Sequence, residues 1–456
     1  MTQQQEHFHR VICGDGVSNA VSNLRRLKYA ATINNEALSE ETDPDFELQY
    51  VDIGNVDSSG RVDQIATHRF EAAPSRARRI VRHGDVIIST VRTYLQAIAA
   101  IEKPAENLIV STGFAVVRPQ KGKLDANFCK YAVREPRFIN EVITRSVGVS
   151  YPAINASDLG DISISLPSLA EQRAIAGYLD RETGRLDALV VAKERWLELL
   201  AEKRSALITH AVTRGLNPAA PLRDSGFPWL GQVPKHWRVE RLKFHLHRME
   251  QGWSPQCENN PADAGEWGVL KAGCVNDLEF DPNENKKLPD ELSPALEYEI
   301  EPGDVLMSRA NTTELLGSTA LVRAVRPRLL LCDKLYRLAV NETRLDKEFL
   351  VTFLRSSAGR FGFEREATGA SNSMQNIGQD SVRNIWVSVP PLAEQRAIVA
   401  HIATATAKLD GLRAAAERTI ALLKERRAAL IAAAVTGKIA VPTRPASGKT
   451  GASYEN

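Results

Sequence analysis

The chain has 456 residues, of which 43% are hydrophobic and 25% charged, and its formal net charge is +2. This composition suits roughly two to four globular domains, and the small net charge neither demands nor excludes nucleic acid as a partner. No apolar run approaches the ~20 residues of a membrane span, and the N-terminus lacks the layout of a signal peptide. We therefore expect a cytoplasmic protein whose five cysteines, which form no Cys-x-x-Cys pair, are reduced.

An internal repeat organises the chain. The heptapeptide LAEQRAI occurs twice, 223 positions apart, and residues 167–213 match residues 390–436 at 25 of 47 positions without a gap. Upstream the likeness is weaker but keeps its order, since HGDVIIST (83–90) corresponds to PGDVLMSR (302–309). A repeat of this kind indicates duplicated structural units. The sequence therefore predicts two tandem copies, each with a variable first part and a constant last part.

The variable parts are predicted to be mixed α/β. Strand-like runs such as DVIIST, LIVSTGFAVVR, DVLMSR and LYRLAV stand between turn signals, and in each half a helical stretch and a polar loop follow. The junction RGLNPAAPLRDSGFPWLGQVPKHW is rich in proline and glycine and marks a boundary. We predict a first domain at 1–165, a helical region at 166–215, a linker at 216–236, a second domain at 237–389, a second helical region at 390–439 and a disordered tail at 440–456.

The constant parts are predicted to be long helices. Apolar residues recur at steps of three or four in both copies: Leu186, Leu189, Trp196, Leu200 and Leu207 in the first, and Leu409, Leu412, Ala416, Leu423 and Leu430 in the second. Lys193 and Lys203 interrupt the first series. Such spacing suits a narrow seam between two helices, so we expect an antiparallel pair that separates the two domains. The alternative is that each helix packs only on its own domain.

Signatures of enzyme chemistry are weak in this sequence. SGKT (447–450) resembles the end of a phosphate-binding loop, but Thr443 stands where that loop needs glycine. NNPADAG (259–265) departs from the methyltransferase motif Asn-Pro-Pro-aromatic after its first proline. His245 and His247 are two positions apart and would point to opposite faces of a strand, which does not suit a metal pair. We expect a non-enzyme that binds a partner at two places.

The specific motifs of the chain resemble those of one family. PPLAEQRAIVAHI, KLDGL, LLKERRAALIAAAVTGKI and DSGFPWLGQVPKHWRVERLK are similar, in order, to the specificity subunit of type I restriction–modification systems. The resemblance covers about residues 20–440. It implies two target-recognition domains that each bind one half of a split site in double-stranded DNA, with paired helices that set the spacer between the halves.

The same resemblance implies partners and an absence of catalysis. Two methyltransferase (modification) subunits would dock on the helical regions and methylate adenine at N6 in each half-site. A restriction subunit, an ATP-driven translocase and nuclease, would join them. S-adenosylmethionine, ATP and Mg²⁺ would belong to these partner subunits, and the chain itself would hold no cofactor and no metal. An alternative is an assembly scaffold that has lost its DNA specificity.

DNA-contacting residues are predicted in two places in each half, directly after the GDV strand and in the polar loop before the constant helix. Arginine and lysine suit guanine edges and phosphates, asparagine and glutamine suit adenine, and serine and threonine are adaptable. In the first half the candidates are Thr90, Arg92, Thr93, Tyr94, Arg145, Ser150 and Tyr151. In the second half they are Lys271, Arg309, Asn311, Thr312, Ser371, Asn372, Ser373 and Gln375. Each of them could instead be a solvated loop residue.

Partner docking is predicted at the polar core of the repeated heptapeptide. The candidates are Glu171, Gln172 and Arg173 together with their twins Glu394, Gln395 and Arg396. Two identical partner subunits need two identical surfaces, which would explain an exact repeat. A purely structural need, such as capping of the helix start, would preserve the same residues.

Overall fold

The computed structural model describes residues 23–57, 60–148, 150–257, 259–277, 279–371 and 374–441. The chain divides into two compact units, which we call the first unit (Met1–Glu194 with Arg418–Asn456) and the second unit (Arg195–Glu417). The predicted tail beyond residue 441, with its SGKT stretch, lies outside the described residues. Among the residues that are described, no helix is long and apolar enough to cross a membrane.

The first unit contains two four-stranded sheets. One has the antiparallel order β2 (Ala31–Ile33), β9 (Phe114–Pro119), β6 (Val86–Ser89) and β7 (Ile98–Ala100). The other has the order β4 (Ala66–Arg69), β3 (Glu47–Val51), β8 (Leu108–Ser111) and β5 (Ala77–Ile80), with β3 and β8 parallel. A short pair joins β1 (Leu24–Arg26) to β10 (Ser163–Ser165). The mixed α/β class predicted from the sequence is confirmed.

The second unit repeats this topology. Its main sheet has the order β14 (Leu246–Gln251), β21 (Leu335–Val340), β17 (Val305–Ser308) and β19 (Thr319–Leu321). Its second sheet has the order β16 (Asn285–Lys287), β15 (Gly268–Leu270) and β20 (Leu329–Leu330), again with a parallel pair. The smaller pairs are β13 (Arg238–Arg241) with β24 (Trp386–Val389) and β11 (Leu222–Asp224) with β12 (Gln232–Pro234).

The strands predicted from DVIIST and DVLMSR lie at the centre of their units. All four residues of β6 are buried, and so are all four of β17. In β6, Val86 and Ile88 pack in the core beneath the helices, whereas Ile87 packs in the core shared with the second sheet. Because alternate residues of a strand face opposite sides, burial on both faces requires a continuous apolar run.

A tight turn precedes each of these central strands. Gly84 has a φ of +88° and Gly303 a φ of +97°, a backbone region that glycine adopts without strain. The carboxylate of the next residue closes the turn, since Asp85 accepts a hydrogen bond from the Arg82 backbone N–H at 2.8 Å. Asp304 accepts the equivalent bond from Glu301 at 3.0 Å. The repeated Gly-Asp-Val is therefore a structural motif.

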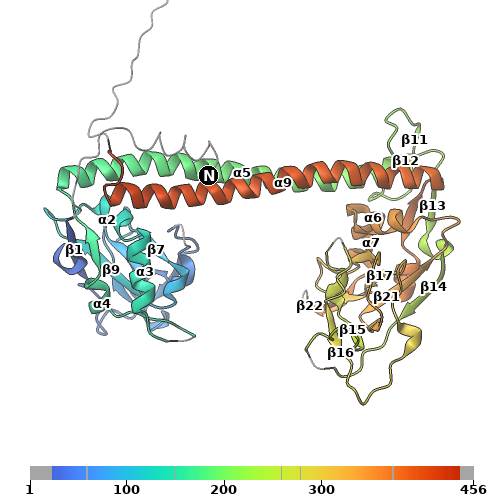
Figure 1. Ribbon diagram of the computed structural model, residues 1–456, viewed down its shortest axis with the longest axis horizontal. Helices are drawn as coiled ribbons and strands as arrows, with labels where there is room; N and C mark the ends of the chain where they lie inside the picture. The colour runs from blue at the N-terminus through green and yellow to red at the C-terminus, as the bar shows by residue number, and fades with distance from the viewer. Residues whose placement is uncertain are drawn as a thin grey trace, which may run out of the picture. The chain divides into compact units, whose positions relative to one another are not determined.

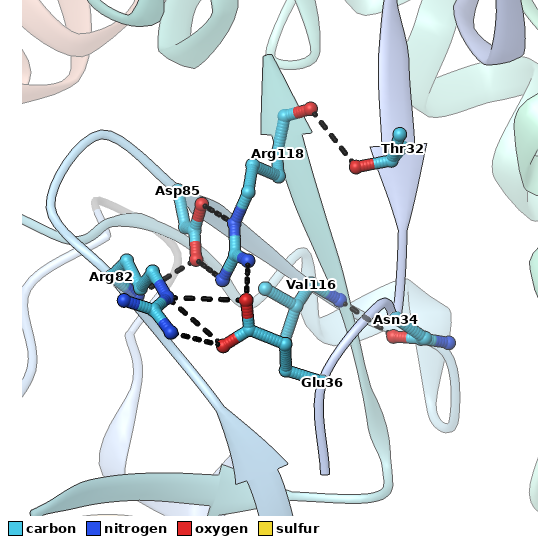
Figure 2. Close-up of polar contacts among 7 residues, drawn as sticks. All are labelled: Thr32, Asn34, Glu36, Arg82, Asp85, Val116 and Arg118. Carbon is cyan, nitrogen blue, oxygen red and sulfur yellow. Dashed lines mark hydrogen bonds and ion pairs between the residues drawn. The ribbon is translucent and has the colours of Figure 1, made fainter. Parts of the chain in front are cut away.

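In the first unit the buried carboxylate of Asp85 also anchors an ion-pair network, drawn in Figure 2. The Arg118 guanidinium on β9 donates to both oxygens of Asp85, at 2.9 and 2.8 Å, and pairs with Glu36 at 2.6 Å. A hydrogen bond from Arg82, and then the Arg118 contact, lower the pKa of the Glu36 carboxyl. The network ties the segment after β2 to strands β6 and β9.

Short helices cover the main sheet of each unit. The first unit has α2 (Ala126–Ala132), α3 (Pro136–Arg145) and α4 (Ala156–Gly160), and the second has α6 (Lys347–Arg355), α7 (Ser357–Glu366) and α8 (Gln379–Arg383). Asp125 caps α2 by accepting from two backbone N–H groups, and Asp346 caps α6 in the same way. The helical stretches predicted after the strands are therefore present, each with an acidic N-cap.

The constant segments form two long helices, α5 (Leu169–Arg214) and α9 (Leu392–Val435), which run side by side within each unit (Figure 1). Ion pairs show that they are antiparallel. In the first unit Arg427 meets Asp187 at 2.9 Å, and in the second unit Arg204 meets Asp410 at 2.5 Å. The predicted antiparallel helix pair is confirmed.

The seam of α5 follows a heptad rhythm, but one predicted seam residue on each long helix is exposed. Its more buried positions recur at alternating steps of four and three: Leu179, Thr183, Leu186, Val190, Lys193, Leu197, Leu200, Arg204, Leu207 and Ala211. Leu189 and, on α9, Leu412 are exposed. The stem of Lys193, predicted to break the seam, lies in it, because a long side chain can bury its methylenes and keep its charge in water.

Candidate nucleic-acid interface

In the first unit the two segments that carry the DNA-contact candidates meet. We call residues 90–95, 145–148 and 150–154 the first loop junction. Its backbone is held by hydrogen bonds from Arg92 N–H to the Pro152 carbonyl at 2.8 Å and from Ile154 N–H to the Thr90 carbonyl at 2.9 Å. Val147 and Ala153 exchange two further bonds, each of 2.9 Å. Segments more than 50 residues apart therefore form one ordered surface.

The candidate side chains in this junction have different surroundings. The Arg92 guanidinium lies 4.8 Å from the centre of the exposed Tyr151 ring, a cation–π distance, and Arg92 adopts a left-handed backbone with φ of +53°. Tyr94 and Ser150 are also exposed. Thr93 is buried, and its hydroxyl lies 2.8 Å from that of Ser146, so its side chain is not exposed at the surface of the junction. Thr90 is half-buried, and its hydroxyl donates to the Gly113 carbonyl at 2.8 Å.

Arg145 closes α3 at the edge of the junction. Its guanidinium pairs with Glu141 at 2.9 Å, one turn earlier on the same helix. This exposed pair is worth little to stability, since both groups remain in contact with water. Arg145 is therefore available to exchange Glu141 for a phosphate oxygen.

The second unit has the equivalent junction, residues 309–314, 366–371 and 374–377, which we call the second loop junction. The Ile377 N–H donates to the Arg309 carbonyl at 3.0 Å, as Ile154 does to Thr90. Here the segments pair as strands, β18 (Ala310–Asn311) with β23 (Met374–Asn376) and β23 with β22 (Thr368–Ser371), and Asn311 lies opposite Gln375. Ser371 belongs to β22, whereas Asn372 and Ser373 lie outside the described residues.

The side chains of the second junction are mainly amides and a guanidinium. The Asn311 amide donates to the Asn276 side chain at 2.9 Å and accepts from the Thr312 N–H at 2.9 Å. Asn276 ends the short helix η6 (Ala272–Val275), and the half-exposed Lys271 begins it. Sequence reasoning missed Asn276, whose position after VLKAGCV gave no polar-loop signal.

Two buried polar atoms in this junction lack a partner among the described residues. They are Nε of Arg309 and the hydroxyl of Thr312. Another guanidinium nitrogen of Arg309 donates to the Asp333 carbonyl at 3.1 Å, and the group lies 5.9 Å from the Tyr336 ring centre. Burial without a hydrogen-bonding partner costs free energy at both atoms.

The repeated heptapeptide joins each long helix to its own unit. Gln172 is fully buried. Its carbonyl oxygen accepts from the Asp125 N–H at 2.8 Å, and its amide donates to the carbonyls of Lys123 and Pro167 at 3.0 and 2.8 Å. We call this arrangement the glutamine clamp. It fixes the start of α5 to the turn that begins α2.

The second unit contains the same clamp. Gln395 is fully buried, accepts from Asp346 N–H at 2.7 Å and donates to the carbonyls of Arg344 and Pro390 at 3.1 and 2.8 Å. A buried amide with its polar atoms paired inside its own unit offers no surface to a partner. The structural alternative therefore accounts for both glutamines, and their docking role stays a prediction.

The neighbours of the two glutamines differ in exposure. Arg173 and Arg396 expose 71% and 70% of their side chains, and each makes a long ion pair with the capping aspartate, at 3.6 Å to Asp125 and 3.8 Å to Asp346. They present the same group in the same surroundings in both units. Of the predicted docking residues, these two form a matched exposed pair.

The glutamates of the heptapeptide differ between the units. Glu171 forms a capping box with Ser168, whose N–H and hydroxyl donate to it at 2.9 and 2.7 Å, and these bonds lower the pKa of Glu171. Proline replaces this serine in the second unit, and Glu394 lies 2.8 Å from the His236 ring. His236, which precedes the buried Trp237, was not predicted from the sequence.

Within the described ranges of the chain, no group of three or more His, Cys, Asp or Glu side chains could hold a metal ion. His245 is buried and its Nε2 lies 2.9 Å from Glu240. Burial lowers the pKa of His245. The four described cysteines are free, and three of them are buried. What the surface of each unit offers is a set of hydrogen-bonding, cationic and aromatic groups on two ordered loop junctions.

Comparisons with known proteins agree with this geometry. Residues 73–189 match the family model described as type I restriction modification DNA specificity domain. The chain is 28% identical over 207 residues to the type I restriction enzyme EcoEI specificity subunit of Escherichia coli, covering 45% of this chain and 34% of that one. It is 23% identical over 334 residues to the EcoKI specificity subunit of E. coli K12, covering 72% and 68%.

A solved chain of a type I restriction–modification system, from work on its complex assembly and conformational transition, has the same fold. It superposes with a TM-score of 0.69 at 24% identity over 90% of this chain and 97% of that one. The shared fold is a duplicated α/β unit, each copy of which packs on the paired helices α5 and α9. The chain is thus similar to type I restriction–modification specificity subunits. The specificity subunit is a non-catalytic component of such a system, as the sequence predicted.

Proposed function

We propose that each unit recognises one half of a bipartite site in double-stranded DNA through its loop junction. The observation that carries this proposal is that the two junctions share a backbone hydrogen bond but carry different side chains. Thr90 and Arg309 accept the same backbone hydrogen bond in their units, but the residues that follow them differ. Two loop junctions with the same backbone arrangement and different exposed side chains suit two different DNA sequences.

The second junction offers groups that match base edges. An asparagine or glutamine amide forms two hydrogen bonds with adenine in the major groove, and arginine does so with guanine. Asn311 and Gln375 lie opposite each other on paired strands, and the Arg309 and Thr312 atoms without a partner lie beside them. Lys271, Arg92 and Arg145 suit phosphates or guanine, and Ser150 and Ser371 suit either.

The helix pair is proposed to set the spacer between the half-sites. Both helices are continuous, over 46 residues for α5 and 44 for α9. A heptad seam resists sliding, because each side chain in the seam sits between residues of the facing helix. A fixed spacer requires such a rigid element.

The matched arginines are proposed to mark two equivalent docking places for methyltransferase subunits. Those partners would bring S-adenosylmethionine and extrude the target adenine from the duplex for methylation at N6. Restriction subunits, which use ATP and Mg²⁺, would join the assembly.

We expect Arg173→Ala and Arg396→Ala each to remove one of the two methyltransferase copies, as counted by native mass spectrometry. Arg185→Ala, an exposed control on α5, should leave both; equal loss from all three variants would contradict the proposal.

Domain exchange tests the half-site proposal. Residues 1–165 are replaced by the corresponding residues of another specificity subunit, and the chimera is assembled with the methyltransferase subunits. We expect the methylated motif to change in one half only. A change in both halves, or in neither, would contradict independent recognition. Absence of salt-dependent DNA binding by the assembled wild-type complex would favour a scaffold without DNA specificity.

A further inference from the structure

Large apolar side chains gather on the surface of the first loop junction. Five side chains in or beside it are exposed, from 39% to 80%: Tyr94, Leu95, Ile143, Val147 and Tyr151. We call these five the apolar cluster. Exposed apolar residues are ordinary when scattered, but a group of them on one surface marks an interaction site.

The members of the apolar cluster are held in place. Val147, which is 80% exposed, is fixed by its two backbone bonds to Ala153. Tyr151 stacks under the Arg92 guanidinium, and the Leu95 N–H donates to the Arg92 carbonyl at 2.9 Å. The cluster is therefore an ordered apolar surface that projects from a hydrogen-bonded frame.

The second unit places polar residues at the positions equivalent to three members of the cluster. Counted from the ends of β6 and β17, Tyr94 and Leu95 correspond to Thr313 and Glu314. Counted from the ends of α3 and α7, Ile143 corresponds to Glu364. In the second junction, none of the residues whose side chains are described is a large exposed apolar one. The fold therefore does not require an apolar surface here, and the difference concerns what the first unit binds.

Cations and hydroxyls are interspersed with the apolar cluster. Arg92, Arg145 and Ser150 belong to the same junction and remain exposed. A surface that combines cations with apolar groups suits duplex DNA, whose bases carry one apolar feature in the major groove, the C5-methyl group of thymine. Arginine beside tyrosine is also common in protein–protein interfaces, so loss of assembly is one of the outcomes of the experiments below.

We propose that the apolar cluster recognises thymine methyl groups in the half-site bound by the first unit. This inference rests on the proposed function and assigns different chemistry to the two half-sites. The first unit discriminates through apolar contact with Leu95, Val147 and the two tyrosines. The second unit discriminates through hydrogen bonds from Asn311, Gln375 and Arg309. Loss of one buried methyl group corresponds to about fourfold in affinity.

Uracil substitution tests this inference in the assembled methyltransferase complex. Duplexes carry the wild-type motif, or the same motif with every thymine of one half-site replaced by deoxyuridine, which lacks only the methyl group. We expect uracil in the first unit's half-site to weaken binding at least threefold, roughly the value of one methyl group. The same replacement in the other half-site should change affinity less than twofold. Equal effects in both halves would overturn the inference.

A near-isosteric variant links the effect to the protein. Val147→Thr keeps the shape of the side chain and adds a hydroxyl, so it should lower the preference for thymine over uracil. The double variant Val147→Thr/Leu95→Asn should bind the two duplexes equally. Ile65→Thr, which changes another exposed residue of the first unit outside the junction, should keep the wild-type preference for thymine. Retention of that preference in Val147→Thr together with Leu95→Asn would overturn the assignment to these residues.

The outcomes separate this inference from the proposed function. Sequence-specific binding without any sensitivity to uracil would overturn thymine recognition and leave half-site recognition standing. Absence of sequence-specific binding would overturn both. If Val147→Thr weakened assembly with the methyltransferase subunits and left the uracil ratio unchanged, the cluster would be a protein contact and the inference would be wrong.

Discussion

The glutamine clamps and the loop junctions both occur in each unit, but the two copies of the clamp share their side chains whereas the two copies of the junction do not. In the clamps both the side chains and their contacts are the same, down to the three hydrogen bonds of Gln172 and Gln395. In the junctions the backbone bonds recur but the side chains differ. Within one chain, identical side chains therefore mark the groups that complete the fold, and a shared backbone with different side chains marks the surfaces that face outside.

The difference between the clamps and the junctions changes the meaning of the exact repeat. An exact polar heptapeptide suggests a shared binding surface, but its glutamine is buried in both units. Only the exposed arginine keeps the properties of a docking residue. A repeated motif can thus serve internal structure at one position and a partner at the next.

The largest expected effect comes from lengthening the helix pair. Four residues inserted after Leu200 in α5, with four inserted after Arg413 in α9, add one turn to both helices, or roughly 6 Å. The matched insertion keeps the antiparallel register given by Arg204 and Asp410. We expect methylation of the original site to be lost and sites with a longer spacer to be accepted, as measured by sequencing of methylated DNA. The control substitutes the residues beside the two insertion points and inserts none. An unchanged spacer in a folded insertion variant would contradict the spacer role.

The next effect concerns the clamps themselves. Gln172→Ala leaves one buried N–H and two carbonyl groups without partners and creates a cavity, so it should lower the free energy of unfolding by about 3 kcal/mol or more. Gln395→Ala should cost a similar amount because its bonds are the same. Urea unfolding measures both, with Arg173→Ala as a control that should stay within about 0.5 kcal/mol of wild type. A negligible cost for either glutamine would show that the clamp is not structural.

Substitutions in the junctions should affect recognition and not stability. Arg92→Ala should reduce discrimination at the first unit's half-site, and Asn311→Ala should do so at the other, each by about 1–3 kcal/mol. Competition binding against duplexes with one changed half-site measures the effect. If either variant altered recognition of both half-sites, the two units would not act independently.

The smallest effect distinguishes the two helix starts. The hydrogen bonds from Ser168 lower the pKa of Glu171 from its ordinary 4.5, so their contribution to stability is present above that value and is lost as the pH falls through the lowered pKa of the folded protein. Ser168→Ala should raise the Glu171 pKa in an NMR titration and weaken the cap by about 1 kcal/mol. Pro391, at the twin position, offers no hydroxyl. An unchanged Glu171 titration in the variant would refute the capping box.

Much of the fold could be predicted from the sequence, because its signals are local. The gap-free match of the constant segments indicated two helices, and the apolar runs around the Gly-Asp-Val turns indicated the central strands. In each unit, the segment after the central strand meets the polar loop before the long helix, and this meeting could be anticipated only from the order of the motifs. The strand pairing of Asn311 with Gln375 depends on residues 64 positions apart.

What could not be predicted depends on tertiary contacts. Gln172 is polar and begins a helix, which suggests exposure, but three backbone groups of the surrounding turns enclose it. Thr93 is buried because α3 places Ser146 against it. Leu189 suited a step of three from Leu186, but the seam continues through Val190, one residue further round the helix. Periodicity alone does not decide between such neighbours.

Recognition of two separate half-sites is tested most directly by sequencing the methylated bases of a host that carries this protein with its methyltransferase subunits. Recognition of one half-site by each unit, with the helix pair setting the spacer, predicts a split motif with two specific parts, one modified adenine in each, and a nonspecific gap of constant length. A single continuous motif, or methylation without a motif, would contradict it.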